Sequence, residues 1–190
     1  MKNLSYEDES FIDEDFSSTK LLGKRFDACH FKKCDFSNTN LTQCQFLDCT
    51  FDHCNLSMVI VAEVGFKNVE FQDCKMIGVD FQDCNNILLA MDFSRCQLDF
   101  CSFLKKDLSR SKFLDCKLEE VDFTETNLNG MDFSNCNLFN ATFEKTQLEK
   151  ADFRTAVNYR INPEKNYIRK AKFSLIGVIG LLQKYNIEIE

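Results

Sequence analysis

The sequence has no tryptophan, a single proline, two histidines and no long hydrophobic run. The longest apolar stretch, residues 175–182, is too short to span a bilayer, and the first seven residues contain no apolar signal region. Neither a GxxxxGK(S/T) nor a GxGxxG phosphate-binding motif occurs. We therefore expect a soluble, cytoplasmic protein without a nucleotide site and without contact to a membrane.

The scarcity of histidine argues against catalysis and metal binding. His30 and His53 are the only histidines. Both are expected to point outward, roughly 10 Å apart at the rise of a strand, which is too far to share a proton or a metal. The many Asp and Ser residues belong to a repeated motif and form no catalytic constellation. We predict a protein that is not an enzyme and has no cofactor or metal.

Large apolar side chains recur at every fifth position between residues 88 and 153, and leucine alternates with phenylalanine throughout. After Leu88, the members are Phe93, Leu98, Phe103, Leu108, Phe113, Leu118, Phe123, Leu128, Phe133, Leu138, Phe143, Leu148 and Phe153. On an α-helix these residues would spiral around the cylinder, and on a strand they would alternate between faces. A backbone that turns once every five residues buries them all. The series therefore predicts a solenoid with these side chains as its core stack.

Eleven cysteines occur, and their spacing indicates the length of one coil. Two groups recur at intervals of twenty residues: Cys34, Cys54 and Cys74, and then Cys96, Cys116 and Cys136. Four sides of five residues per coil fit this interval and let like residues stack on like. Every cysteine lies two positions before a pentapeptide centre, where Ala141, Ala151 and Val121 stand elsewhere. We interpret the cysteines as small buried apolar side chains, since no pair has the spacing of a zinc site.

The motif with an apolar centre, a small residue two positions before it and polar flanks resembles that of the pentapeptide repeat proteins. Residues 131–135 (Met-Asp-Phe-Ser-Asn) and 151–155 (Ala-Asp-Phe-Arg-Thr) are examples. The resemblance implies an all-β solenoid, a right-handed quadrilateral β-helix of about seven coils with a C-terminal α-helical cap. We expect a lead-in over residues 1–10, the β-helix over 11–156 with a register slip at about 85–90, and a loop, helix and tail over 157–190.

The C-terminal segment is expected to cap the rod and to join two copies. Ser174 is a suitable N-cap for a helix through about Tyr185. Apolar residues occupy so much of its circumference that one face stays exposed after capping, and Gly177 and Gly180 would let another backbone approach. We predict a C2 homodimer; the alternative is a monomer whose helix is used entirely in capping. The predicted interface residues are Leu175, Ile176, Val178, Ile179 and Leu182. Members of the resembled family often dimerise in this way.

Charge is divided unevenly along the chain. Residues 1–153 contain 16 Lys and Arg and 27 Asp and Glu, which gives a net charge of −11. Residues 154–190 contain 7 Lys and Arg and 3 Asp and Glu, which gives a net charge of +4. An acidic rod argues against direct nucleic-acid binding and suits a protein partner with a basic groove. The candidate acidic surface consists of Asp92, Asp122, Asp132 and Asp152. Lys112 interrupts the column that contains three of these residues.

A rod of about seven coils, at about 4.8 Å each, is on the order of 34 Å long, close to one turn of duplex DNA. In length, acidity and C-terminal helix the chain resembles the gyrase-interacting, Qnr-type and mycobacterial pentapeptide repeat proteins, which imitate DNA. That resemblance implies binding to DNA gyrase or topoisomerase IV and protection against quinolones or peptide toxins. The alternative is an interaction scaffold for an unrelated protein. A continuous acidic face favours the first hypothesis, and a patchy surface with an apolar groove favours the second.

Overall fold

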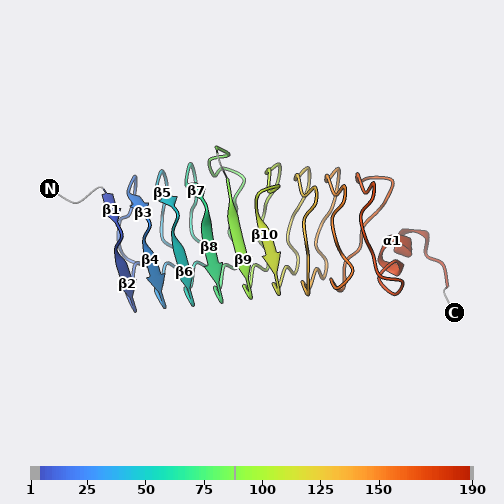
Figure 1. Ribbon diagram of the computed structural model, residues 1–190, viewed down its shortest axis with the longest axis horizontal. Helices are drawn as coiled ribbons and strands as arrows, with labels where there is room; N and C mark the ends of the chain where they lie inside the picture. The colour runs from blue at the N-terminus through green and yellow to red at the C-terminus, as the bar shows by residue number, and fades with distance from the viewer. Residues whose placement is uncertain (1–4, 88, 189–190) are drawn as a thin grey trace.

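The computed structural model describes residues 5–87 and 89–188. The chain winds into a rod of stacked coils, with residue 5 near one end and a short helix at the other (Figure 1). Strands of successive coils pair in parallel. The fold is therefore an all-β parallel solenoid with a short C-terminal helix. The solenoid is the fold that the apolar residues at every fifth position predict. Leu88, the first member of the repeat series, lies outside the described residues.

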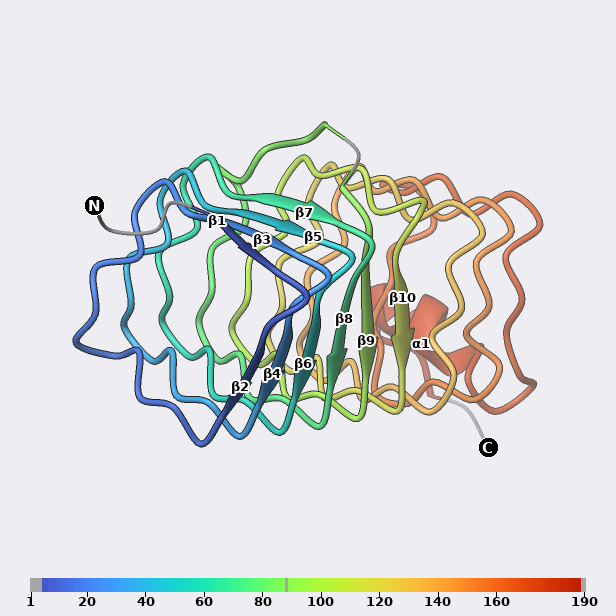
Figure 2. The same ribbon diagram turned by 60° about the vertical axis from the view of Figure 1, so that its left-hand side comes forward.

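The strands form two sheets on neighbouring sides of the coils (Figure 2). One sheet has the order β1-β3-β5-β7 and comprises β1 (Ser5–Glu7), β3 (Arg25–Asp27), β5 (Gln45–Leu47) and β7 (Gly65–Lys67). The other has the order β10-β9-β8-β6-β4-β2 and comprises β2 (Ser10–Ile12), β4 (His30–Lys32), β6 (Thr50–Asp52), β8 (Val69–Gln72), β9 (Met91–Ser94) and β10 (Lys112–Leu114). Isolated parallel bridges continue the pairing on the remaining sides.

The register of the pairing changes once along the rod. Phe31 pairs with Phe51, twenty residues further along the chain. Phe71, however, pairs with Phe93, twenty-two residues further along. Two additional residues therefore enter between β8 and β9, and residues 85–87 project from the rod (Figure 2).

The centre of each pentapeptide points into the rod. All of the residues from Phe93 to Phe153 that are predicted to form the core stack are at most 5% exposed. The rings of Phe93 and Phe113 stack with centroids 5.1 Å apart and planes 4° apart, and Phe103 stacks in the same way on Phe123 at 5.6 Å. Successive coils thus place like on like, and the resulting core runs along the whole length of the rod.

Most sides of the coils end on a residue in the left-handed region, and most of these residues are not glycine. Asp13 and Lys33 both have φ of 54°. Such a conformation costs an L-residue roughly 1–2 kcal/mol because Cβ crowds the following carbonyl. The backbone N–H of Asp13 donates to the carbonyl of Lys32 in the next coil at 3.0 Å. Hydrogen bonds between coils therefore help to offset the strain at the corners.

The residue two positions before each centre also points inward, and its side chain often donates to the preceding coil. The Sγ of Cys101 donates to the carbonyl of Met76 at 2.8 Å, and the Oγ1 of Thr126 donates to the carbonyl of Phe103 at 2.8 Å. All eleven cysteines are buried free thiols. They fill a small site, as predicted from their spacing, and nine of them besides Cys101 likewise donate to backbone carbonyls.

Lys106 occupies one of these inward positions next to the loop. The residue is 3% exposed. Its Nζ donates to the carbonyl of Cys84 at 2.8 Å and to Oδ1 of Asn86 at 2.7 Å. The ammonium group therefore provides hydrogen-bond partners for the polar groups at the base of the loop, where the register changes.

The ends of the ladder differ from the predicted boundaries. Tyr6 pairs with Phe26 in register, so the ladder already includes part of the predicted lead-in, whose residues 1–4 lie outside the described residues. The reason is that Tyr6 occupies a pentapeptide centre, and its ring stacks on that of Phe26 at 5.1 Å. At the other end, Tyr167 pairs with Gln147, so the predicted loop lies within a further turn of the chain.

The C-terminal helix is shorter than predicted. It comprises α1 (Ile179–Leu182) followed by the 3-10 helix η1 (Gln183–Tyr185), and residues 175–178 form turns. The Oγ of Ser174 accepts a hydrogen bond from the N–H of Gly177 at 3.0 Å, so Ser174 caps this turn and not the α-helix. No helix among the described residues is long and apolar enough to cross a membrane.

Replacing Phe123 with alanine is expected to lower the free energy of unfolding by about 3–5 kcal/mol, because it leaves a cavity within the stack. Phe139 is 46% exposed and serves as a matched control. Phe139→Ala should cost much less. Chemical denaturation monitored by circular dichroism measures both changes, and equal effects would contradict the inward assignment of Phe123.

Replacing Lys106 with methionine is expected to cost roughly 1–3 kcal/mol, since the carbonyl of Cys84 and the amide oxygen of Asn86 lose a buried donor. The neighbouring Lys105 is exposed, so Lys105→Met should stay within about 0.5 kcal/mol of the parent chain. The same denaturation experiment compares the two variants. A stable Lys106→Met chain would show that the loop does not need this donor.

Candidate functional site: the rod surface and its C-terminal end

The candidate acidic residues do not lie in one uninterrupted row. Asp132 pairs with Asp152 in one column of the ladder, and Asp92 pairs with Lys112 in the same column. Asp122 belongs to a different column, where it pairs with Ser102 and Thr142. The structure therefore places three of the predicted carboxylates on one side of the coils and the fourth on another.

Cations from the same or a neighbouring coil neutralise two of these carboxylates. Asp92 forms an ion pair with Lys112 at 2.9 Å. Asp152 forms ion pairs with Arg154 at 2.7 Å and with Lys172 at 3.4 Å. The hydrogen bond from Arg154 is the main reason that the pKa of Asp152 is lowered to about 2. This side of the rod is consequently a patchwork of both signs of charge.

The remaining two candidate carboxylates accept hydrogen bonds from their own turns. The Oδ1 of Asp132 accepts from the N–H of Ser134 at 2.9 Å and from its hydroxyl at 2.6 Å. The Oδ1 of Asp122 accepts from the N–H of Thr124 at 2.8 Å. No ion pair involves Asp122 or Asp132 within the part of the chain that the structure describes. Their charges remain available to a partner.

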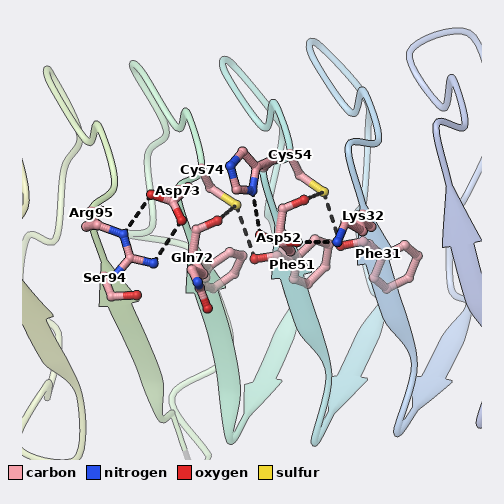
Figure 3. A network of polar contacts seen from close by, with 12 residues as sticks. Phe31, Lys32, Phe51, Asp52, Cys54, Gln72, Asp73, Cys74, Ser94 and Arg95 are labelled. Carbon is pink, nitrogen blue, oxygen red and sulfur yellow. Dashed lines mark hydrogen bonds and ion pairs between the residues drawn. The ribbon is translucent and has the colours of Figure 1, made fainter.

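A second group of charged residues runs across four successive coils in the N-terminal half of the rod (Figure 3). Asp52, His53 and Asp73 place potential metal-ligand atoms within 4.8 Å of one another. Cations already occupy both carboxylates, because Lys32 contacts Asp52 at 3.3 Å and Arg95 binds Asp73 through two hydrogen bonds of 2.8 Å. The arrangement is a row of ion pairs that joins successive coils, and its positive charges disfavour a metal ion.

All eleven thiols are buried, which keeps them from contact with a substrate in solution. Burial raises the pKa of both Cys49 and Cys101 to about 12. Neither thiol would therefore form an appreciable fraction of thiolate at neutral pH. What the rod offers to other molecules is its outward side chains.

The C-terminal end exposes apolar side chains. Leu175 and Ile176 are 91% and 82% exposed, and Ile179 is 43% exposed. Val178 and Leu182, which belong to the same predicted interface, are partly buried. The structure thus brings the five residues together on one short segment, and three of them face solvent.

The two glycines of this segment have a role within the chain. A Cβ added at Gly177 would overlap the hydroxyl of Tyr159, and one added at Gly180 would overlap the backbone carbonyl of the same tyrosine. The N–H of Ile161 also donates to the carbonyl of Gly180 at 3.1 Å. Close approach to Tyr159 therefore accounts for both glycines, which the sequence analysis assigned to contact with another chain.

A groove of about 520 Å³ lies between this segment and the end of the rod. Its apolar lining includes Phe139 and Val157 from the rod and Ile176 and Ile179 from the C-terminal segment. Sequence reasoning missed Phe139 and Val157 as surface residues. The available signal was an apolar residue at outward positions that are polar in most other coils.

Tyr159 and two arginines complete the groove. Arg154 and Arg160 line it, and none of its lining residues is acidic. Arg160 is exposed and has no ion pair among residues 5–87 and 89–188. Tyr159 is 4% exposed, its hydroxyl has no hydrogen-bond partner there, and burial raises its pKa. The groove is therefore lined by apolar and basic side chains without a carboxylate.

The comparisons with known proteins agree with this architecture. No curated protein sequence matches the chain. Full-length QnrB1, a plasmid-mediated fluoroquinolone resistance protein, has a similar structure, with a TM-score of 0.61 and 15% identity over 96% of this chain and 100% of that one. HetL, a pentapeptide repeat protein involved in heterocyst differentiation regulation in the cyanobacterium Nostoc sp. strain PCC 7120, gives a TM-score of 0.64 and 14% identity over 91% of this chain and 87% of that one.

At these identities the structural likeness shows the fold alone. The family assignment comes from the sequence, since the family model described as the pentapeptide repeat region matches residues 24–86 and 85–153. These two matches together cover most of the chain. The chain therefore belongs to the pentapeptide repeat proteins.

Proposed function

We propose that the chain is a non-catalytic protein-binding module that acts in the cytoplasm. The observation that carries this proposal is the exposed apolar C-terminal segment, with Leu175 91% exposed, on a rod whose other outward side chains are mostly polar. Exposed apolar groups that gather beside a groove are typical of protein contact sites. A right-handed, quadrilateral rod of about seven coils forms part of the same proposal.

The first partner class to test is a type II topoisomerase, DNA gyrase or topoisomerase IV. The length of the rod, on the order of 34 Å, is close to one turn of duplex DNA. Residues 1–153 carry a net charge of −11, and such a rod could occupy a basic groove that otherwise holds DNA. The structural likeness to QnrB1, a fluoroquinolone resistance protein, supports testing quinolone protection.

A scaffold for an unrelated protein partner is the second candidate. The interrupted acidic column favours it, because Lys112 neutralises Asp92, and both Arg154 and Lys172 neutralise Asp152. A DNA mimic needs a row of negative charges that follows the spacing of phosphates. Asp122 and Asp132, which are without cationic partners in the described chain, are the carboxylates most suited to that role.

Gyrase supercoiling of relaxed plasmid, with and without a fluoroquinolone, tests the first candidate. We expect the parent chain, at low micromolar concentration, to inhibit supercoiling or to restore supercoiling in the presence of the fluoroquinolone. The double charge reversal of Asp122 and Asp132 to lysine should weaken this effect at least several-fold. The same reversal at the exposed Asp13 and Asp83 provides a control of equal net charge. No effect of the parent chain up to tens of micromolar would contradict a topoisomerase partner and leave the scaffold proposal.

We also propose that two copies associate through Leu175, Ile176, Val178, Ile179 and Leu182 as a C2 dimer. The substitution Ile179→Asp should then halve the mass measured by light scattering, because it places a charge in the apolar contact. Ile12 is 58% exposed at the opposite end of the rod, so Ile12→Asp should leave the mass unchanged. A parent chain with the mass of a single copy would refute the dimer.

A further inference from the structure

The C-terminal groove has the properties of a receptor for an extended acidic segment with apolar side chains. Phe139 and Val157 are 46% and 50% exposed on its rod side, and Ile176 is 82% exposed on the other. Open apolar walls of this kind remain hydrated until another molecule covers them. An occupant of the groove would therefore bury side chains from both of its walls.

The charge of the groove restricts the occupant further. Arg154 already binds Asp152, whereas the guanidinium of Arg160 has no carboxylate partner among residues 5–87 and 89–188. Tyr159 adds a buried hydroxyl without a hydrogen-bond partner in that part of the chain. Because acids are absent from the lining, the groove favours an occupant that brings carboxylates and hydrogen-bond acceptors.

The C-terminal tail of the chain has this chemistry. After η1 the sequence continues Asn186-Ile187-Glu188-Ile189-Glu190, so isoleucine and glutamate alternate over the last four residues. In an extended segment, alternate residues point to opposite sides. One side of the tail would then carry isoleucine and the other carboxylates, which complements apolar walls beside a guanidinium group.

The tail leaves its own rod instead of folding back. Asn186 has φ of 48° and ends the 3-10 helix, and Ile187 beyond it is 55% exposed. In Figure 1 the chain continues away from the last coil after η1. Gln183, which lines the groove, precedes Ile187 by only four residues, so the tail has little length with which to reverse into the same groove.

We infer that the groove binds residues 187–190 of a second copy, with isoleucine side chains against Phe139, Val157 and Ile176 and a glutamate facing Arg160. This arrangement rests on the proposed dimer and specifies a contact through which the two copies join. Each copy supplies one tail and one groove, so a two-fold axis satisfies both grooves at once and closes the assembly at two chains. Each groove is complete only when the other copy contributes its tail.

A labelled peptide with the sequence of residues 184–190 tests the inference directly. It is titrated by fluorescence polarisation into a chain that ends at Asn186. We expect saturable binding, and at least tenfold weaker binding after Arg160→Glu. The exposed Arg110 provides a matched charge reversal, and Arg110→Glu should bind like the parent. A peptide with both isoleucines replaced by serine should not bind.

Light scattering on the same chains distinguishes the tail from the rest of the interface. We expect the full chain to be dimeric and the shortened chain to be mainly monomeric. A dimer that survives removal of the tail, together with a peptide that does not bind, would overturn the tail assignment and leave the dimer proposal intact. A monomeric full chain whose shortened form binds the peptide would place the tail in its own groove and overturn both the second-copy assignment and the proposed dimer.

Discussion

The structure depends on the stacking of each pentapeptide centre on its counterpart in the next coil. This contact is repeated in parallel register, so that Phe93 stacks on Phe113 at 5.1 Å and Phe133 on Phe153 at 4.8 Å. Each coil contacts only its neighbours, and stability is therefore approximately a sum of such steps. The same stacking fixes the height and direction of every outward side chain, and the surface has the periodicity of the core.

That fixed register explains the patchy surface. Residues in one outward column lie one coil apart, so a single lysine in an acidic column meets a carboxylate, as Lys112 meets Asp92 at 2.9 Å. At each end of the rod no further coil stacks, so the register of the coils does not fix the side chains beyond it. At the C-terminal end, the chain leaves the repeat and packs Gly177 and Gly180 over Tyr159. This departure from the repeat creates the groove and exposes Leu175.

Much of the fold could be predicted because the core residues recur with a single period of five residues. A side chain every five residues identifies the inward face, and a shift of two in that series locates the loop near Asn86. The rest depends on interactions that have no period. The sequence places Lys106 where small residues usually stand, but only the structure shows that its ammonium group reaches Cys84 and Asn86. The helix prediction was too long because apolar content does not reveal the contact of its glycines with Tyr159. The acidic surface was predicted by composition, which does not show which carboxylates are paired.

We propose that rods of stacked coils join at their C-terminal ends, and small-angle X-ray scattering of the full chain in solution tests this proposal most directly. With the proposed count of about seven coils, one rod extends on the order of 34 Å, and two rods joined end to end extend about twice that. We predict an elongated particle with the mass of two chains and a maximum dimension close to the longer value. A pair no longer than one rod would show side-by-side association and contradict the account.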